Sequence, residues 1–314
     1  MLGIAMEREI REQPEVLRRN ADSYRDQSER ALAGYDPQMV LLVARGSSDN
    51  AALIARYWLE VTLGIPVSLA APSVLTRFKR KIKYPRCLAI GISQSGAAPD
   101  VAEVLGSLRD DGHRTVAITN TRNSRITQEA EHSIYLDAGP ELSVAATKTY
   151  TSTLLALYQI VRALAPSMPE PTTPADEWCE RARGAAEDAS GIVVRSSPVF
   201  SLGRGYGFGT AHETALKLME CALIPCKAYS SADFEHGPKA LAGHGSAAIS
   251  YGGEMPELKK HGCEIVVAQD PGVAEELKPI WDVFFGQWLA LLAARARGLD
   301  PDDPRHIQKI TETL

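Results

Sequence analysis

The chain has 314 residues, a net charge of −5 and 45% hydrophobic residues. This length suits two domains or one large domain, and the composition is that of a globular protein. The mild acidity argues against general nucleic-acid or anionic-membrane binding, because no face has to be basic. The first residues become charged too early for a signal peptide, and no run of about 18 apolar residues occurs, so we expect a cytoplasmic protein.

Residues 6–33 predict one or two charged helices, interrupted near Pro14. Beyond them we expect strands at 39–46, 65–72, 87–93, 115–120 and 132–139, and helices at 50–64, 99–111 and 145–166. Strands that alternate with helices of this length indicate a parallel sheet covered on both faces. The basic run "RFKRKIKYPR" (77–86) is expected to be a solvated loop, because like charges tend to stay exposed.

The proline-rich segment 167–177 predicts a linker, after which the pattern restarts as an internal repeat. Arg45-Gly46 aligns with Arg204-Gly205, and Ile65-Pro66 aligns with Ile224-Pro225, each 159 residues further on. The sequence therefore predicts an α/β protein with two sheets of parallel strands flanked by helices. The expected boundaries are a helical segment at 1–33, domains at 34–166 and 191–298, a linker and helix at 167–190, and a tail at 299–314.

Polar turns follow two of the expected strands in the first half. Ser93, Gln94, Ser95 and Gly96 come between strand 87–93 and a helix, where backbone N–H groups and the helix dipole suit a phosphate. Serine and glutamine add neutral donors, and glycine lets the ligand approach the backbone. Ser47 and Ser48 stand at the equivalent point of the first strand. The alternative in both places is a polar turn that only caps a helix.

Two further turns have simpler interpretations. Lys148, in the turn 143–150, either pairs with an anion or is a solvated helix lysine, and we favour the second. The glycines of "GRGYGFG" (203–209) fall at every second position, which does not fit the dinucleotide pattern, so nucleotide binding is disfavoured.

The expected helix around 212–220 carries Glu213, Lys217 and Glu220 on one face, because they are spaced i, i+4 and i+7. A solvated ion-pair ladder is one interpretation. The other is proton transfer by a carboxylate beside an ammonium group. His236 lies in a loop before Gly-Pro and is the residue type that titrates near neutral pH. A lone loop histidine is usually inert, but this one accompanies the Glu/Lys helix and the phosphate-like turns.

Cysteine spacing gives little support to a structural zinc site, since none of the five cysteines forms a CxxC pair. Cys221, Cys226 and His236 could meet in principle, but buried thiols are the better expectation. We predict no metal and no cofactor.

Seven segments together resemble the sugar isomerase (SIS) family: "MEREIREQP", "ARGSSDNAA", "SQSG", "AGPELSVAATK", "ETALKLME", "EHGP" and "PRHIQK". The chain resembles the isomerase half of glucosamine-6-phosphate synthase, and still more the stand-alone, isomerase-type glucosamine-6-phosphate deaminases. This resemblance implies two flavodoxin-like SIS domains, a sugar phosphate ligand and a homodimer with a shared active site.

The resemblance also implies roles for single residues. Glu220 matches the carboxylate that carries a proton between C1 and C2 of the sugar, and Lys217 matches the lysine beside it. His236 matches the ring-opening histidine, often donated by the neighbouring subunit, and Lys309 matches the lysine that reaches the open-chain carbonyl and can form an imine. The implied substrate and phosphate-binding set is Ser47, Ser48, Ser93, Gln94, Ser95, Gly96, Val144 and Ala146.

Three alanines depart from the synthase pattern. Ala97 and Ala98 stand where the synthase has Glu-Thr, and Ala146 replaces a serine, so the pocket loses two hydroxyl groups. The "MEREIREQP" motif begins at Met6, so we expect no glutaminase domain. The leading interpretation is conversion of glucosamine 6-phosphate to fructose 6-phosphate and ammonia.

Two alternatives remain open: an ammonia-dependent or ammonia-free ketose/aldose phosphate isomerase, and a non-catalytic sugar-phosphate-binding SIS protein. The joint presence of Lys217, Glu220, His236 and Lys309 favours an enzyme.

Overall fold

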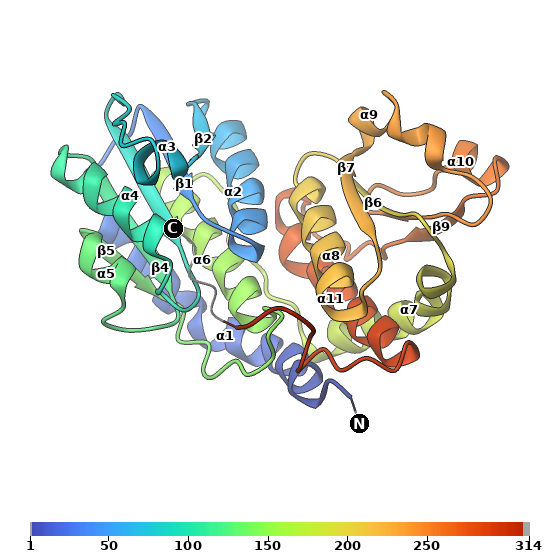
Figure 1. The fold of residues 1–314 in the computed structure, drawn as a ribbon. Coiled ribbons are helices and arrows are strands. Elements are labelled where there is room, and N and C mark those ends of the chain that lie inside the picture. Colours follow the sequence, from blue (N-terminus) through green and yellow to red (C-terminus); the bar gives the residue numbers. More distant parts are fainter. Residues whose placement is uncertain (1, 310–314) are drawn as a thin grey trace. The chain divides into compact units, whose positions relative to one another are not determined.

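The computed structural model describes residues 2–309, which fall into two compact units. The first-sheet unit comprises residues 16–140 and 149–171. The second-sheet unit comprises residues 2–15, 141–148 and 172–309. Each contains one parallel sheet flanked by helices (Figure 1). Among the described residues no helix is long and apolar enough to cross a membrane.

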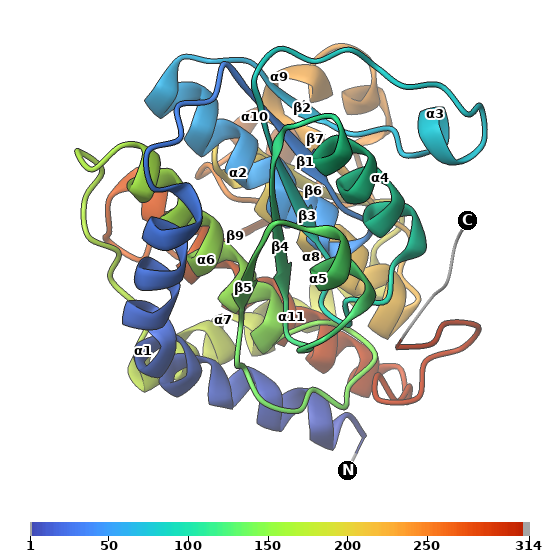
Figure 2. The same ribbon diagram turned by 90° about the vertical axis from the view of Figure 1, so that its left-hand side faces the viewer.

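The first sheet has the strand order β2-β1-β3-β4-β5, and every neighbouring pair is parallel. Its strands are β1 (Met39–Val43), β2 (Val67–Leu69), β3 (Cys87–Ile92), β4 (Arg114–Thr119) and β5 (His132–Tyr135). Helices α4 (Pro99–Asp110) and α5 (Arg125–Glu129) cover one face, and α2 (Ser47–Leu63) and α6 (Lys148–Leu164) cover the other (Figure 2). Every residue of β1 and β3 is buried, as expected for apolar runs in a doubly covered sheet. The five predicted strands are confirmed.

The second sheet has the order β7-β6-β8-β9, again entirely parallel. Its strands are β6 (Val199–Gly203), β7 (Cys226–Ser230), β8 (Ala247–Ser250) and β9 (Glu264–Val267). Its helices are α7 (Asp176–Arg195), α8 (Gly207–Ala222), α9 (Ser231–Phe234), α10 (Pro256–Lys260) and α11 (Lys278–Ala296), with short 3-10 turns η1 (Pro238–Leu241) and η2 (Glu275–Leu277). Helix α11 packs against both α7 and α8 (Figure 1).

The internal repeat is visible in the backbone. The turn from β1 to α2 and the turn from β6 to α8 each contain an Arg-Gly pair, and the two glycines have nearly the same positive φ. Gly46 has φ +56° and Gly205 has φ +57°. In each sheet the strand before this turn lies between the next two strands of the chain. The two halves therefore repeat one topology.

Helix α1 (Ile4–Leu32) runs without interruption through Pro14, so the predicted break is wrong. Proline lacks the N–H that would pair with the carbonyl of Ile10 one turn earlier. The side chain of Gln13 donates to that carbonyl instead, with Nε2 3.0 Å from the oxygen. The same amide nitrogen lies 2.8 Å from Oε1 of Gln287 in α11.

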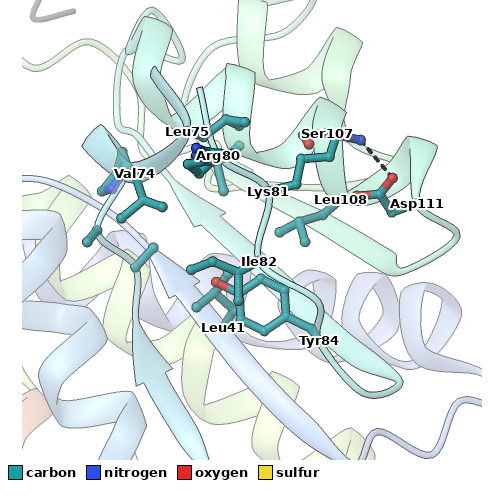
Figure 3. A pocket seen from close by; sticks show the side chains of 14 residues that line it. Leu41, Val74, Leu75, Arg80, Lys81, Ile82, Tyr84, Ser107, Leu108 and Asp111 are labelled. Carbon is teal, nitrogen blue, oxygen red and sulfur yellow. Dashed lines mark hydrogen bonds and ion pairs between the residues drawn. The ribbon is translucent and has the colours of Figure 1, made fainter. Parts of the chain in front are cut away.

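The basic segment 77–86 is a largely exposed loop, as predicted. Its apolar members Ile82 and Tyr84 line a small cavity with Leu41 and Leu108, and Lys81 pairs with Asp111 at 2.7 Å (Figure 3). The cavity measures about 40 Å³, which is room for a water molecule and too little for a sugar phosphate. All five cysteines are free and buried, as expected for structural thiols.

Candidate active site

The turn after β3 is held by its backbone. The carbonyl of Gln94 accepts hydrogen bonds from the N–H of Asn120 (3.0 Å) and the hydroxyl of Thr119 (3.2 Å), and the carbonyl of Ser93 accepts one from Gly96. Within the described chain, the Ser93 hydroxyl and the Gln94 side-chain amide make no hydrogen bond. Both polar groups are therefore free to meet a ligand.

Gly96 is required at its position for two reasons. Its φ is +68°, which residues with a Cβ atom rarely adopt. A Cβ atom built there would lie 2.1 Å from Oγ of Ser124, which is closer than any real contact. The absence of a side chain lets the turn pack against Ser124 and brings the backbone close to whatever binds there.

The two serine-rich turns are not explained by helix capping. The N-cap residue of α2 is Gly46 and that of α4 is Ala98, and neither helix has a side-chain cap. Ser47 and Ser48 instead form the first turn of α2, where backbone N–H groups lack intrahelical partners. Of the serines in question, Ser95 is engaged locally, accepting the N–H of Ala97 at 3.3 Å.

Strand pairing brings these two turns to one edge of the first sheet. Strands β1 and β3 are parallel neighbours, with Val43 opposite Gly91. Nε of Arg45, after β1, lies 2.8 Å from the buried carboxylate of Asp100 in α4. The chain leaves β1 toward β2 on one side, and β3 lies on the other, so this edge is the topological switch point where ligands of such sheets bind.

The segment 141–148 of the second-sheet unit is clamped by two carboxylates. Glu9 of α1 accepts the N–H groups of Leu142 and Ser143, the latter at 3.2 Å. Burial raises the pKa of Glu9, although these two hydrogen bonds oppose the change. Glu141 accepts the N–H of Thr147 at 3.0 Å. Val144 and Ala146, two predicted substrate-binding residues, lie half-buried in this hydrogen-bonded segment.

Lys148 is not the solvated lysine that the sequence favoured. Only 3% of the residue is exposed, and its ammonium group pairs with the carboxylate of Glu12 in α1. A buried ammonium group needs such a partner, because burial of an unpaired charge is costly. Lys148 thus ties the segment 141–148 to the start of α1 within the second-sheet unit.

Lys309 reaches the clamped segment from the tail. Its Nζ lies 2.7 Å from Oε2 of Glu141 and 2.7 Å from the carbonyl oxygen of Ser143. The structure therefore joins two of the motifs on which the resemblance rests, "PRHIQK" and "AGPELSVAATK". In this arrangement the amine of Lys309 is a hydrogen-bonded ammonium group.

Helix α8 carries a buried charge cluster and not a solvated ladder. Lys217 is 1% exposed, with Nζ 3.5 Å from Glu213 and hydrogen-bonded to Glu220. Burial, the largest single influence, lowers the pKa of Lys217, but the Glu213 and Glu220 carboxylates together raise it well above its ordinary value. Lys217 is therefore a permanent cation that fixes both carboxylates in place.

Glu220 differs from its neighbours by its access to solvent. Its side chain is 26% exposed and lines a cavity of about 190 Å³ together with Asp300, Asp303 and Arg305 from the tail. One carboxylate oxygen pairs with Lys217 while the group as a whole faces the cavity. A carboxylate with this geometry can accept and return a proton.

His236 lies far from Glu220 in the same chain. It is exposed, follows β7 and α9, and its imidazole makes no hydrogen bond within residues 2–309. Helix α8 starts at the carboxyl end of β6, and Glu220 comes 13 residues after its first residue, Gly207, or roughly 20 Å along the helix. Because β7 is parallel to β6, His236 comes after the carboxyl end of the sheet, whereas Glu220 lies toward the other end.

Sequence reasoning missed two of the positioning residues. Glu9 and Glu141 hold the segment that carries Val144 and Ala146, and Glu141 also binds Lys309. Both lie inside segments of the resemblance, but nothing in their spacing showed that their carboxylates cap backbone N–H groups. Within residues 2–309, no set of three or more His, Cys, Asp or Glu side chains is arranged to hold a metal ion.

Comparison with known proteins identifies the domain family of the first half of the chain. Residues 35–163 match the family model of the SIS domain. These residues form a SIS domain. The parallel sheet of this SIS domain and the switch-point turns with Ser47, Ser48 and Ser93 lie within the matched range.

Relatives extend the similarity beyond the SIS domain. The chain is 32% identical over 340 aligned residues to glutamine--fructose-6-phosphate aminotransferase (isomerizing) of Methanothermobacter thermautotrophicus, which covers 97% of this chain and 56% of that protein. It thus spans about half the length of the curated relatives it matches.

Two solved structures match nearly the whole chain. Glucosamine-6-phosphate deaminase of Thermotoga maritima is 25% identical with a TM-score of 0.73, covering 95% of this chain and 100% of that one. The C-terminal domain of glucosamine-fructose-6-phosphate aminotransferase of Francisella tularensis shares the fold at 24% identity and a TM-score of 0.80, covering 94% and 97%. The resemblance stated from the sequence is confirmed.

Proposed function

We propose that the protein is a sugar-phosphate isomerase that deaminates glucosamine 6-phosphate to fructose 6-phosphate and ammonia. The observation that carries the proposal is the Lys217–Glu220 pair: a buried permanent cation holds a carboxylate that faces a cavity. Similarity to the Thermotoga maritima deaminase over that protein's entire length supports the choice of reaction.

The phosphate is assigned to the switch-point turns of the SIS domain. Ser47, Ser48, Ser93 and Gln94 supply hydroxyl, amide and backbone donors, and Gly96 leaves the backbone accessible. Neutral donors and helix N-termini bind phosphate without a lysine. Val144 and Ala146 belong to the hydrogen-bonded segment 141–148 and are assigned to the sugar.

The proton transfer is assigned to Glu220. After ring opening, the aldehyde form of the sugar loses a proton from C2 to the Glu220 carboxylate, and the same proton returns to C1. The C2 nitrogen also gives up one proton and the C1 oxygen takes one up, so the C1 aldehyde and C2 amine become a C1 alcohol and a C2 imine. Water adds to the imine, the C–N bond breaks, and ammonia leaves with formation of the C2 ketone.

The two lysines have different roles in this proposal. Lys217 is fixed by two carboxylates and stays charged, so it stabilises negative charge near Glu220 and moves no proton. Lys309 lies in the tail and is held by one carboxylate and one carbonyl group of the segment 141–148. Lys309 is assigned to binding the C1 oxygen. Formation of an imine between Lys309 and the C1 carbon would require that the amine leave Glu141 and lose its proton.

We further propose that the active site is shared between two copies of the chain. Ring opening is assigned to His236, which lies at the opposite end of the second sheet from Glu220. A homodimer in which one subunit's His236 serves its partner's Glu220 would unite the two groups. The second-sheet unit is proposed to be a second SIS domain, because it repeats the strand order of the first at a constant sequence offset.

The decisive experiment is ammonia release from glucosamine 6-phosphate by the purified protein, with fructose 6-phosphate measured in parallel. Equal amounts of both products are expected. If neither glucosamine 6-phosphate nor related amino sugar phosphates release ammonia while the protein still binds them, the deaminase proposal fails, and the non-catalytic alternative holds if fructose 6-phosphate is not converted either.

The 32% identity to the aminotransferase favours a second candidate, in which ammonia and a ketose phosphate give the amino sugar phosphate. Product analysis from fructose 6-phosphate separates the possibilities. Amino sugar formation only with added ammonium salts supports this candidate, and formation of an aldose phosphate without ammonium supports a plain isomerase.

A further inference from the structure

A second cavity opens in the second-sheet unit, away from Glu220. It measures about 710 Å³ and is lined by the turns after β6, β8 and β9 and by the start of α11. The chain leaves β6 toward β7 on one side, and β8 lies on the other, so this is the topological switch point of the second sheet. Ligands of open parallel sheets bind at such points.

By the internal repeat, this cavity is the counterpart of the serine-lined turns in the SIS domain. Its chemistry is different. The turns after β6, β8 and β9 contain Arg204, Tyr251, Gly252 and Asp270, and none of these three turns contains a serine or threonine. The cavity is therefore not a second copy of the phosphate-binding turns.

Asp282 is the residue that points to a ligand. It lies on α11, lines the cavity and is 7% exposed. Within residues 2–309 it makes no hydrogen bond and no ion pair, and Lys278, one turn earlier, pairs with Asp270 at 3.0 Å. A buried carboxylate without a partner is costly, and such groups are usually paired in folded proteins.

Burial also shifts the pKa of this carboxyl group. Burial raises the pKa of Asp282, Lys278 partly opposes this and Asp270 adds to it, so that the pKa is about 8. A cation placed in the cavity beside Asp282 would remove this cost. Among residues 2–309, including those that line this cavity, no three His, Cys, Asp or Glu side chains are arranged to hold a metal ion, so an organic ammonium group is the matching cation.

The rest of the lining fits a small polar molecule. Tyr206, Gln269 and Glu275 supply polar groups around the opening, and the cavity volume lies in the range of small-molecule sites. We propose that the cavity at the carboxyl ends of β6, β8 and β9 binds a small hydroxylated primary amine, whose ammonium group pairs with Asp282. This site is separate from the Glu220 cavity, and the inference does not depend on the proposed function.

Glucosamine and glucose are matched probes, because they differ by an amine in place of one hydroxyl group. Calorimetric titration at pH 8 should show millimolar binding of glucosamine to the wild-type protein. Asp282→Asn should weaken it at least about tenfold, and glucose should bind weakly and equally to both. Asp188→Asn, an exposed aspartate of α7, is the matched control and should bind glucosamine like the wild type.

A crystal structure with glucosamine provides the second measurement. The amine nitrogen is expected within hydrogen-bond distance of the Asp282 carboxylate. The proposal is overturned if glucosamine does not bind, if Asp282→Asn binds it as tightly as the wild type, or if density for it appears only elsewhere. Failure of ammonia release from glucosamine 6-phosphate would leave this result unchanged, so the two proposals fail separately.

Discussion

The ammonium group of Lys217 donates a hydrogen bond to the carboxylate of Glu220 on the same face of α8, and it lies 3.5 Å from Glu213. Lys217 and Glu213 are both buried. Charged side chains are common on helix surfaces. Here, however, the charges of Lys217 and Glu213 are removed from water, so each charge is stabilised mainly by the other.

Removal of the cation should therefore destabilise the protein. Lys217→Met leaves Glu213 buried without its counter-charge, and we expect a loss of about 3–5 kcal/mol in the free energy of unfolding, measured with urea. Lys260→Met is the matched control, because Lys260 pairs with Glu257 on the surface, and it should cost less than about 1 kcal/mol. A Lys217→Met protein as stable as the control would contradict the prediction.

Glu220→Gln should separate chemistry from binding. The amide keeps the shape of the side chain but cannot take a proton from carbon, so we expect ammonia release to fall about 10²–10⁴-fold. Binding of fructose 6-phosphate, measured by calorimetry, should change by less than about threefold. Glu254→Gln, at an exposed position, should keep full activity. Full activity in Glu220→Gln would exclude Glu220 as the proton carrier.

Mixing two inactive variants tests whether the active site is shared. Glu220→Gln and His236→Asn should each be inactive alone. If His236 serves the partner's Glu220, mixed dimers contain one intact site of two, and random reassociation should restore about a quarter of the wild-type activity. The measurement is ammonia release after co-refolding equal amounts of both proteins. No recovery in proven mixed dimers would show that each chain uses its own His236.

Ala98 offers a test of the departures from the synthase pattern. It is the N-cap residue of α4 and provides no side-chain cap. Ala98→Thr should add a hydrogen bond to the first turn and stabilise the protein by about 1 kcal/mol relative to Ala98→Val, which has the same shape without a hydroxyl. Urea unfolding of both variants measures the difference. Equal stabilities would mean that the threonine hydroxyl is not used as a cap.

Asp282 should make stability fall as pH rises. Its pKa is about 8 in the folded protein and 3.8 as the ordinary value, so between these pH values the folded state holds one more proton than the unfolded state. The contribution to the free energy of unfolding therefore decreases with pH, by at most about 1.4 kcal/mol per unit. Asp282→Asn should remove this slope.

The matched measurement is urea unfolding of the wild type, Asp282→Asn and Asp188→Asn at several values between pH 5 and pH 8. The advantage of Asp282→Asn over the wild type should grow with pH, while Asp188→Asn should follow the wild type. An offset that stays constant across this range would show that Asp282 titrates normally.

Local pattern was enough to predict the five parallel strands of the first sheet. Apolar runs such as β3, buried along its whole length, have few other interpretations in a chain of alternating strands and helices. The same pattern placed Ser93 and Gly96 at a strand end, and spacing placed Lys217 and Glu220 on one helix face.

Contacts between distant segments were not predictable in this way. Lys148 was expected to be solvated because its immediate neighbours gave no sign of Glu12, its partner 136 residues away. Asp282 lies in an apolar helix whose sequence does not reveal the cavity formed by three other turns. Burial and pairing of charges depend on tertiary packing, which periodicity does not report.

Pro14 has a consequence for protein engineering. Replacing a proline inside a helix with alanine is expected to strengthen the helix, since it restores an N–H that can bond to the carbonyl of Ile10. Here that carbonyl is already bonded to Gln13, which also holds Gln287, whose amide in turn donates to the carbonyl of Thr147 in segment 141–148. The alanine N–H of Pro14→Ala would compete with Gln13 for the first acceptor in this series of hydrogen bonds. We therefore expect any gain in thermal stability to be accompanied by looser positioning of Val144 and Ala146.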